Sequence, residues 1–230
     1  MEITLSPKDV SRKLSFFIVL LLIAHITVVT ISLVTGHDTI YGLVPLFHFG
    51  SESNIPTLYS SITLLACSAL LWTIAKSHKK QNQPYRYWLG LAVLFLFLSV
   101  DETASLHERS GEPIRAMMGT SGLLYYGWMI PYGAAMLFIV TLYLRFLVRL
   151  PKKTSKIFIV SGVVYITGAI GMEMLGGWWH ESHGIHNLTY YSLVTLEELF
   201  EMFGIVLFIH TLLTYICDEL DPFSMTIKND

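Results

Sequence analysis

Charged residues and cysteines are both scarce in this chain of 230 residues. Only 14% of the residues are Asp, Glu, Lys or Arg, whereas 53% are hydrophobic, a balance that is not typical of a soluble domain. The two cysteines, Cys67 and Cys217, lie in apolar sequence without a metal-ligand spacing, which argues against a disulfide framework and against a thiolate metal site. The net charge of −2, without a basic patch outside the loops, gives no reason to expect a nucleic-acid partner.

Long apolar runs are what the chain has instead. Several of them approach or exceed the roughly 20 residues that a helix needs to cross a bilayer. The sequence therefore predicts an all-α, polytopic membrane protein, a bundle of six transmembrane helices that forms a single domain over residues 1–230 with the lipid bilayer around it. The first run is longer than the apolar core of a signal peptide and lacks a cleavage site, so we expect it to be retained. The predicted spans are 14–34, 57–76, 87–107, 123–148, 157–178 and 191–217.

The positions of lysine and arginine predict the orientation. All but Arg109 and Arg115 of the 15 Lys and Arg residues lie before the first span, around the connections after the second and fourth spans, or in the tail at Lys228. Cytoplasmic loops are enriched in these residues, so both termini are predicted to be cytoplasmic, in a bacterial inner (plasma) membrane. The outer loop 36–56, in which Gly and Pro interrupt apolar residues, is expected to form a re-entrant or surface-lying cap.

Acidic residues interrupt three of the apolar spans at a similar depth. With a rise of about 1.5 Å per residue, Asp101, Glu173 and Glu201 all fall about 20 to 24 Å from the inner ends of their spans. The three acids are therefore predicted to meet in one layer, in the outer half of a hydrocarbon core about 30 Å thick. An ionised carboxylate at that depth is costly unless it faces protein or water and finds a partner, which favours a functional role.

The residue types in this layer predict a metal site. Carboxylate oxygens combined with imidazole nitrogens favour Fe, Mn or Zn. Glu102 and Glu198 are also the candidate general bases toward metal-bound water. Di-metal sites in helical bundles use similar ligands, but their Glu-x-x-His pair is absent here, so the analogy concerns ligand type alone. The predicted metal ligands are Asp101, Glu102, His107, Glu173, His180, His183, Glu197 and Glu201.

Some of these residues have a structural alternative. Thr195 and Glu198 match a capping box at the start of the sixth span, which would give Glu198 a structural role. His180, His183 and His186 recur at every third residue, a spacing that does not keep to one helical face, so a solvated outer loop is the alternative to a ligand set. Five other residues are assigned to structure: Glu108, Glu112 and Glu181 as solvated loop acids, and His25 and His210 as hydrogen-bonded interior histidines.

The function predicted from this layer is that of a membrane-embedded metalloenzyme, a hydrolase or an oxidoreductase. Its substrate would be a lipid-like or small molecule that reaches the outer face beneath the 36–56 loop. One alternative is a proton- or ion-coupled transporter in which the acids titrate in turn, although the inner halves of the third and fifth spans are nearly purely apolar. Another is a non-catalytic partner subunit or sensor, and the sequence identifies no protein partner for it.

Overall fold

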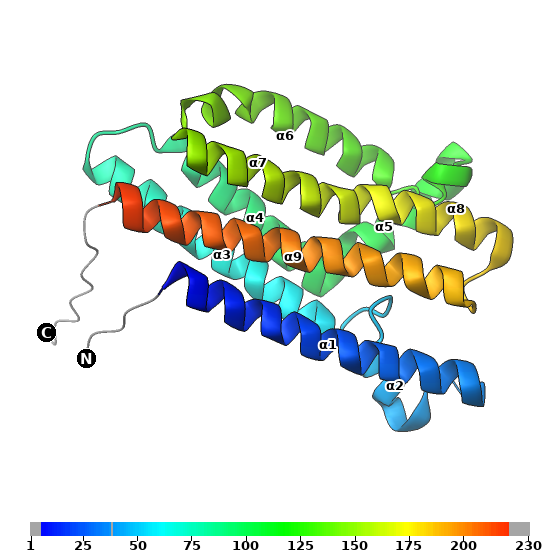
Figure 1. Ribbon diagram of the computed structural model, residues 1–230. Helices are drawn as coiled ribbons and strands as arrows, with labels where there is room; N and C mark the ends of the chain where they lie inside the picture. Colours follow the sequence, from blue (N-terminus) through cyan, green and yellow to red (C-terminus); the bar gives the residue numbers. More distant parts are fainter. Residues whose placement is uncertain (1–5, 38, 221–230) are drawn as a thin grey trace, which may run out of the picture.

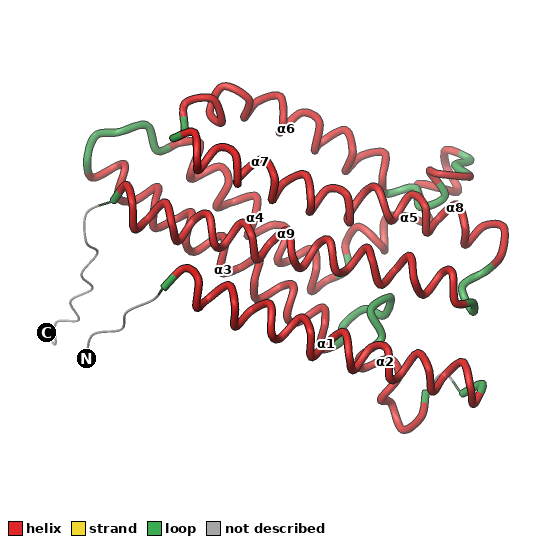
Figure 2. Tube along the Cα trace, in the orientation of Figure 1, coloured by secondary structure: helices red, strands yellow, loops and turns green. Residues whose placement is uncertain are grey.

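Helices account for every regular element in the computed structural model, which describes residues 6–37 and 39–220 (Figures 1 and 2). Within these ranges, six helical stretches are long and apolar enough to cross a membrane. The all-helical class and the number of membrane-length helices are therefore confirmed, while Lys228 lies outside the described residues. The six stretches are α1 (Pro7–Thr35), α3 (Ile55–Lys80), α4 (Arg86–Ala104), α6 (Met129–Arg149), the continuous run Lys152–His183 and α9 (Leu188–Glu219).

The run Lys152–His183 and the connections contain the remaining elements. The run divides into α7 (Lys152–Ile166), the π-helical η3 (Thr167–Met172) and α8 (Glu173–His183). The connections contain η1 (Ile40–Gly42), α2 (Leu43–Phe47), α5 (Leu106–Met118) and η2 (Gly122–Leu124). In Figure 1, α1 begins and α9 ends at one end of the bundle, here called the basic end. Helices α2 and α5 and the end of α8 lie at the opposite end, here called the site end.

The start of α9 contradicts the predicted capping box. The side chain of Asn187 caps the helix by accepting a hydrogen bond of 3.0 Å from the amide of Tyr190, as N-cap residues do. Thr195 and Glu198 therefore lie about two and three turns inside the helix. The Thr195 hydroxyl donates instead to the carbonyl of Tyr191 at 2.6 Å. The prediction that Glu198 serves as a cap residue is wrong, and Glu198 remains a candidate for the site.

A break at Ser105 separates α4 from α5. Ser105 has a φ of 51° and a ψ of 46°, a left-handed conformation that is rare for residues other than glycine. The predicted third span, 87–107, therefore ends earlier, and His107 and Glu108 belong to a separate helix that changes direction. Asp101 and Glu108 therefore lie on different helices, α4 and α5. The Ser105 hydroxyl donates to Oε2 of Glu52 at 3.0 Å, which ties the break to the loop before α3.

Other predicted limits also shift. Helix α6 begins at Met129 rather than at residue 123, with Pro131 in its first turn, where the missing amide hydrogen costs no helical hydrogen bond. The fifth membrane-length run extends to His183 rather than to residue 178. Glu173 and His180, two of the predicted ligands, thus lie on the same helix, α8.

An apolar core fills the half of the bundle nearer the basic end. Trp88, which is 2% exposed, meets Phe146 edge to face at a ring separation of 5.0 Å and Tyr215 at 4.8 Å. Small residues let α3 and α4 approach each other closely. The approach is close enough for the Ser68 hydroxyl to donate a hydrogen bond of 2.7 Å to the Ala92 carbonyl. Further members of this core are Leu64, Cys67, Leu71, Ile74, Leu91, Ile205, Phe208, Ile209 and Leu212.

Glycines bring the run Lys152–His183 against α9. A Cβ on Gly168 would lie 2.6 Å from the carbonyl oxygen of Glu197 and 2.8 Å from Cγ of Glu201. A Cβ on Gly204 would lie 2.8 Å from the amide nitrogen of Tyr165. Side chains at these two positions would force the helices apart. Because Gly168 has no side chain, the acidic residues of α9 lie directly against η3.

Candidate metal centre

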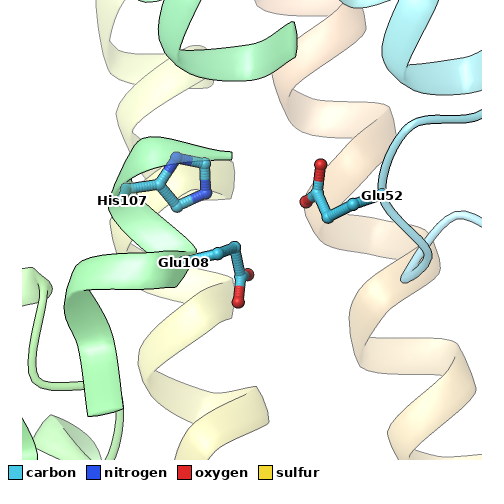
Figure 3. Close-up of side chains that lie close together, drawn as sticks. All are labelled: Glu52, His107 and Glu108. Carbon is cyan, nitrogen blue, oxygen red and sulfur yellow. The ribbon is translucent and has the colours of Figure 1, made fainter. Parts of the chain in front are cut away.

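Glu52, His107 and Glu108 form the most compact group of metal-ligand types in residues 6–37 and 39–220. One ligand atom from each residue lies within 4.8 Å of the other two. Glu52 comes from the loop before α3, whereas His107 and Glu108 come from the first turn of α5. Figure 3 shows the Glu52 carboxyl facing the His107 ring and the Glu108 carboxyl. These three residues are called the outer triad below.

The loop that carries Glu52 is fixed by Asn54. The amide nitrogen of the Asn54 side chain donates to the carbonyls of His48 and Ser51 at 2.7 and 2.6 Å. Its side-chain oxygen accepts from the amide of Thr57 at 3.0 Å and so caps α3. Asn54 is 8% exposed, and its buried hydrogen bonds hold the backbone two residues from Glu52 in one conformation.

Asp101 holds the ring of His107. Oδ2 of Asp101 lies 2.8 Å from Nδ1 of His107, while Oδ1 accepts from the Tyr132 hydroxyl at 2.8 Å and from the His107 amide at 3.2 Å. The contact with a carboxylate assigns the proton to Nδ1, which leaves Nε2 to bind a ligand. Carboxylate–histidine pairs of this kind orient metal-binding imidazoles. Asp101, a predicted ligand, already accepts three hydrogen bonds and is placed as the group that positions His107.

Neighbouring charges shift the pKa values of His107 and Glu108. Burial disfavours the charged imidazole, but the hydrogen bond and charge of Asp101 outweigh this effect and, with Glu108 and Glu52, raise the pKa of His107 to about 9. Loss of surrounding water and the charge of Glu173 raise the pKa of Glu108 to about 7, despite the opposing charge of His107. Both residues therefore hold protons that a metal ion must displace.

Five further carboxylates converge beside the outer triad, and they are called the interhelical carboxylates. They are Glu102 of α4, Glu173 of α8, and Glu197, Glu198 and Glu201 of α9.

Mutual electrostatic contact places these five groups in one cluster. The Glu201 carboxyl interacts with those of Glu102, Glu173 and Glu52. The Glu197 carboxyl touches that of Glu173. Among the described residues, no lysine or arginine forms an ion pair with any member. Acids of α4, α8 and α9 thus lie within electrostatic range of one another.

His180 and His183 lie apart from these carboxylates. Nδ1 of His180 is 2.9 Å from the hydroxyl of Tyr126. The ring of His183 stacks on Trp179 at a separation of 3.9 Å, and the residue is exposed near the end of α8. Both predicted ligands thus have partners other than the acidic cluster. The nearby Glu181 carboxylate accepts a hydrogen bond from a backbone amide in η2.

Two tyrosines form the boundary between His180 and the cluster. The hydroxyls of Tyr126 and Tyr190 lie 3.1 Å apart, and both side chains interact electrostatically with Glu173 and Glu108. Burial raises the pKa of Tyr126 well above its ordinary value. Tyr126 can pack against α8 because Gly177 has no side chain, since a Cβ there would lie 2.9 Å from Cδ2 of Tyr126.

Three members of the centre were not predicted as such. Glu52 carried one sequence signal, an acid in an apolar loop on the same predicted side as the acidic layer. Glu108 was expected to be a solvated loop acid, but it lies in α5 and belongs to the outer triad. Tyr132 lies in the fourth predicted span, and no pattern in the sequence connects it to Asp101. The interior assignment of His25 is confirmed, because its Nδ1 accepts from the Phe49 amide at 3.0 Å.

A protein-family model described as a domain of unknown function, DUF8692, matches residues 14–216. The chain belongs to the DUF8692 family. No curated protein and no solved structure matches it. The matched region of this DUF8692 member contains the whole outer triad and all five interhelical carboxylates. Carboxylate oxygens with one imidazole are a donor set for hard or borderline divalent cations.

Proposed function

We propose that this DUF8692 member is a membrane-embedded metalloenzyme whose divalent cation, Fe, Mn or Zn, is bound by the outer triad. The observation that carries the proposal is the group Glu52, His107 and Glu108, with ligand atoms within 4.8 Å of one another and with His107 held by Asp101. Three protein ligands leave coordination positions for water and substrate, which is the arrangement of catalytic rather than structural metal sites.

The bound cation would supply Lewis-acid chemistry, lowering the pKa of a water molecule or polarising a substrate oxygen. Glu102 is the proposed general base, because its carboxyl interacts with Glu52 and His107 without belonging to the outer triad. Glu198 is the second candidate, since it interacts with Glu102 and Glu52 from α9. Asp101 keeps His107 in place and takes no direct part. This chemistry serves a hydrolase or an oxidoreductase.

The exposure of the site residues indicates how a substrate approaches. Glu52 and Glu108 are exposed at the site end, whereas Asp101 and Glu173 are 5% and 7% exposed. The site therefore opens toward the end of the bundle that carries α2 and α5, which the distribution of lysine and arginine assigns to the outer face. A lipid-like molecule in the outer leaflet or a small molecule outside a bacterial inner membrane is the proposed substrate class.

Ion-coupled transport has less support in the structure. A conduit needs polar groups along its whole length, but Leu71, Ile74 and Trp88 are buried in an apolar core on the path to the basic end. The acids lie in one half of the bundle.

The test is elemental analysis of the detergent-purified protein, after expression with Fe, Mn and Zn supplied. Wild type should contain at least one equivalent of one of these metals, and His107→Ala should lose it. Glu52→Gln, a change in an exposed loop residue, gives a second variant that leaves the helices intact. Glu112→Gln, an exposed acid of α5 outside the triad, is the matched control and should retain the metal. Folded, monodisperse wild type without metal would overturn the proposal.

A further inference from the structure

We propose that the basic end of α6 binds an anionic phospholipid. The phosphate of this lipid lies between Arg145 and Arg149, and one of its acyl chains runs along the exposed face of the helix. The inference goes beyond the proposed function, because it involves no residue of the metal centre. The two proposals share only the membrane location of the protein.

A shallow groove of about 300 Å³ lies at the basic end of α6. Two apolar and two cationic side chains line it: Leu144, Arg145, Val148 and Arg149. Leu144 and Val148 are 52% and 85% exposed, and both arginines are exposed as well. The groove therefore presents hydrocarbon and positive charge side by side, and a phosphate attached to an acyl chain matches both.

The face of α6 that leads to the groove is apolar and exposed. Helix α6 lies at the edge of the bundle (Figure 1), and its packed side carries Tyr143 and Phe146, whose rings both contact Tyr87. Leu137 and Phe138, on the other side, are 64% and 70% exposed. Each lies seven residues before a member of the groove and shares its face. From Phe138 to the end of α6 the helix rises about 16 Å, close to half of a hydrocarbon core about 30 Å thick.

The two arginines of the groove have no acidic partner within residues 6–37 and 39–220. Lys153 of α7 differs from them, because it pairs with Asp218 at 3.8 Å. A guanidinium matches the oxygens of a phosphate with its fixed fork of N–H groups, and cations beside the hydrocarbon of a membrane attract anionic lipids. The adjoining apolar face selects a lipid over a free phosphate ion, which has no hydrocarbon to place there.

The experiment is native mass spectrometry of the full-length protein in detergent, with phosphatidylglycerol and phosphatidylcholine of identical acyl chains. Wild type should retain one phosphatidylglycerol per chain and bind it about tenfold or more tightly than phosphatidylcholine. Arg145→Gln/Arg149→Gln should lose this preference. The matched control is Lys76→Gln/Lys80→Gln, which removes two exposed cations at the same spacing from α3 and should keep the preference.

A phosphate competitor separates the headgroup from the chain. Inorganic phosphate at the lipid concentration should not displace phosphatidylglycerol from wild type, and this lipid should raise the unfolding temperature of wild type more than that of the arginine variant. Equal affinity for both lipids, or an equal loss in the lysine control, would overturn the inference, as would displacement by phosphate alone or a dimer that covers this face without lipid. Metal content should be the same in all these variants, so either proposal can fail without the other.

Discussion

The same helices run through both ends of the bundle, but they carry apolar side chains at one end and acidic side chains at the other. Helix α4 contributes Trp88 to the apolar core and Glu102 to the acidic cluster, and α9 contributes Tyr215 to the core and Glu201 to the cluster. Packing at the basic end lowers the free energy of the folded state, whereas like charges at the site end raise it. The comparison teaches that the apolar half holds the acids together against their own repulsion, so the two halves should respond differently to substitution.

The largest effect is expected from Trp88→Ala in the apolar core. Trp88 is 2% exposed and packs on Phe146 and Tyr215, so truncation should lower the free energy of unfolding by about 3 to 5 kcal/mol. Thermal or denaturant unfolding in detergent measures this loss. Trp72→Ala, a change at a residue of α3 that is 52% exposed, is the control and should cost far less. Metal content per folded molecule should stay unchanged, and its loss would mean that the two halves are not separable.

The next largest effect is expected from Gly168→Ala, a change where the apolar half of the bundle meets the acidic half. The new Cβ would lie 2.6 Å from a backbone oxygen of α9, so η3 and α9 must separate, at a cost of about 1 to 3 kcal/mol. Metal binding should weaken in the same variant because the Glu201 carboxyl, which interacts with Glu52, moves. Gly133→Ala is matched to it, since nothing lies within 4 Å of that Cβ, and it should preserve both properties. Equal behaviour of the two alanine variants would contradict the close packing of η3 on α9.

A smaller effect distinguishes a positioning residue from a ligand within the site end. Asp101→Asn keeps the shape of the side chain but weakens its hold on His107, so metal affinity should fall about 10- to 100-fold while the number of bound ions stays the same. Tyr132→Phe removes one donor to Asp101 and should cause a smaller loss. Isothermal titration with the preferred metal measures both. Complete loss of one ion in Asp101→Asn would make Asp101 a direct ligand, as the sequence predicted.

The last comparison is a pH dependence with opposite signs for stability and metal binding. The pKa of His107 is raised from 6.5 to about 9, so the stability gained from its pair with Asp101 is complete below pH 6.5 and is lost as the pH rises through 9. The pKa of Glu108 is raised from 4.5 to about 7, so its ionisation also lowers the stability of the metal-free protein between these values.

Metal affinity should rise over the same range, by up to about tenfold per pH unit for each proton displaced. Unfolding temperatures and metal titrations from about pH 5 to about pH 9, the range set by these two pKa values, measure the two trends. His107→Gln should abolish the upper part of the stability curve, because the pair with Asp101 is lost. Stability of the metal-free wild type that increases from about pH 7 to about pH 9 would contradict the assigned Asp101–His107 pair.

The sequence predicted the features that depend on local composition. Apolar runs long enough to span a bilayer become helices whatever their neighbours are, and the shared depth of Asp101, Glu173 and Glu201 follows from the helical rise alone. The break at Ser105 could not be predicted, because nothing in the sequence marks a left-handed serine. That break moved His107 and Glu108 onto a new helix, and it is the reason why the third predicted span was too long.

Partners that come from distant segments were also beyond the sequence. Glu52 reaches His107 because the loop before α3 is tied down by Asn54, and Tyr132 meets Asp101 across two helices. Neither contact has a spacing that can be recognised in one chain. His180 shows the converse, since it was predicted to bind the metal with Glu173, yet its ring contacts the hydroxyl of Tyr126.

The loop origin of Glu52 has a consequence for how the protein is made. His107, Glu108 and the interhelical carboxylates are all carried by helices, so they come together as the bundle packs in the membrane. Glu52 alone sits in a short segment outside any helix, and this segment is held in place by Asn54 at the start of α3. Because the Glu52 side chain is exposed, the proposed ion would reach the outer triad from the side where this loop lies, after the helices have packed.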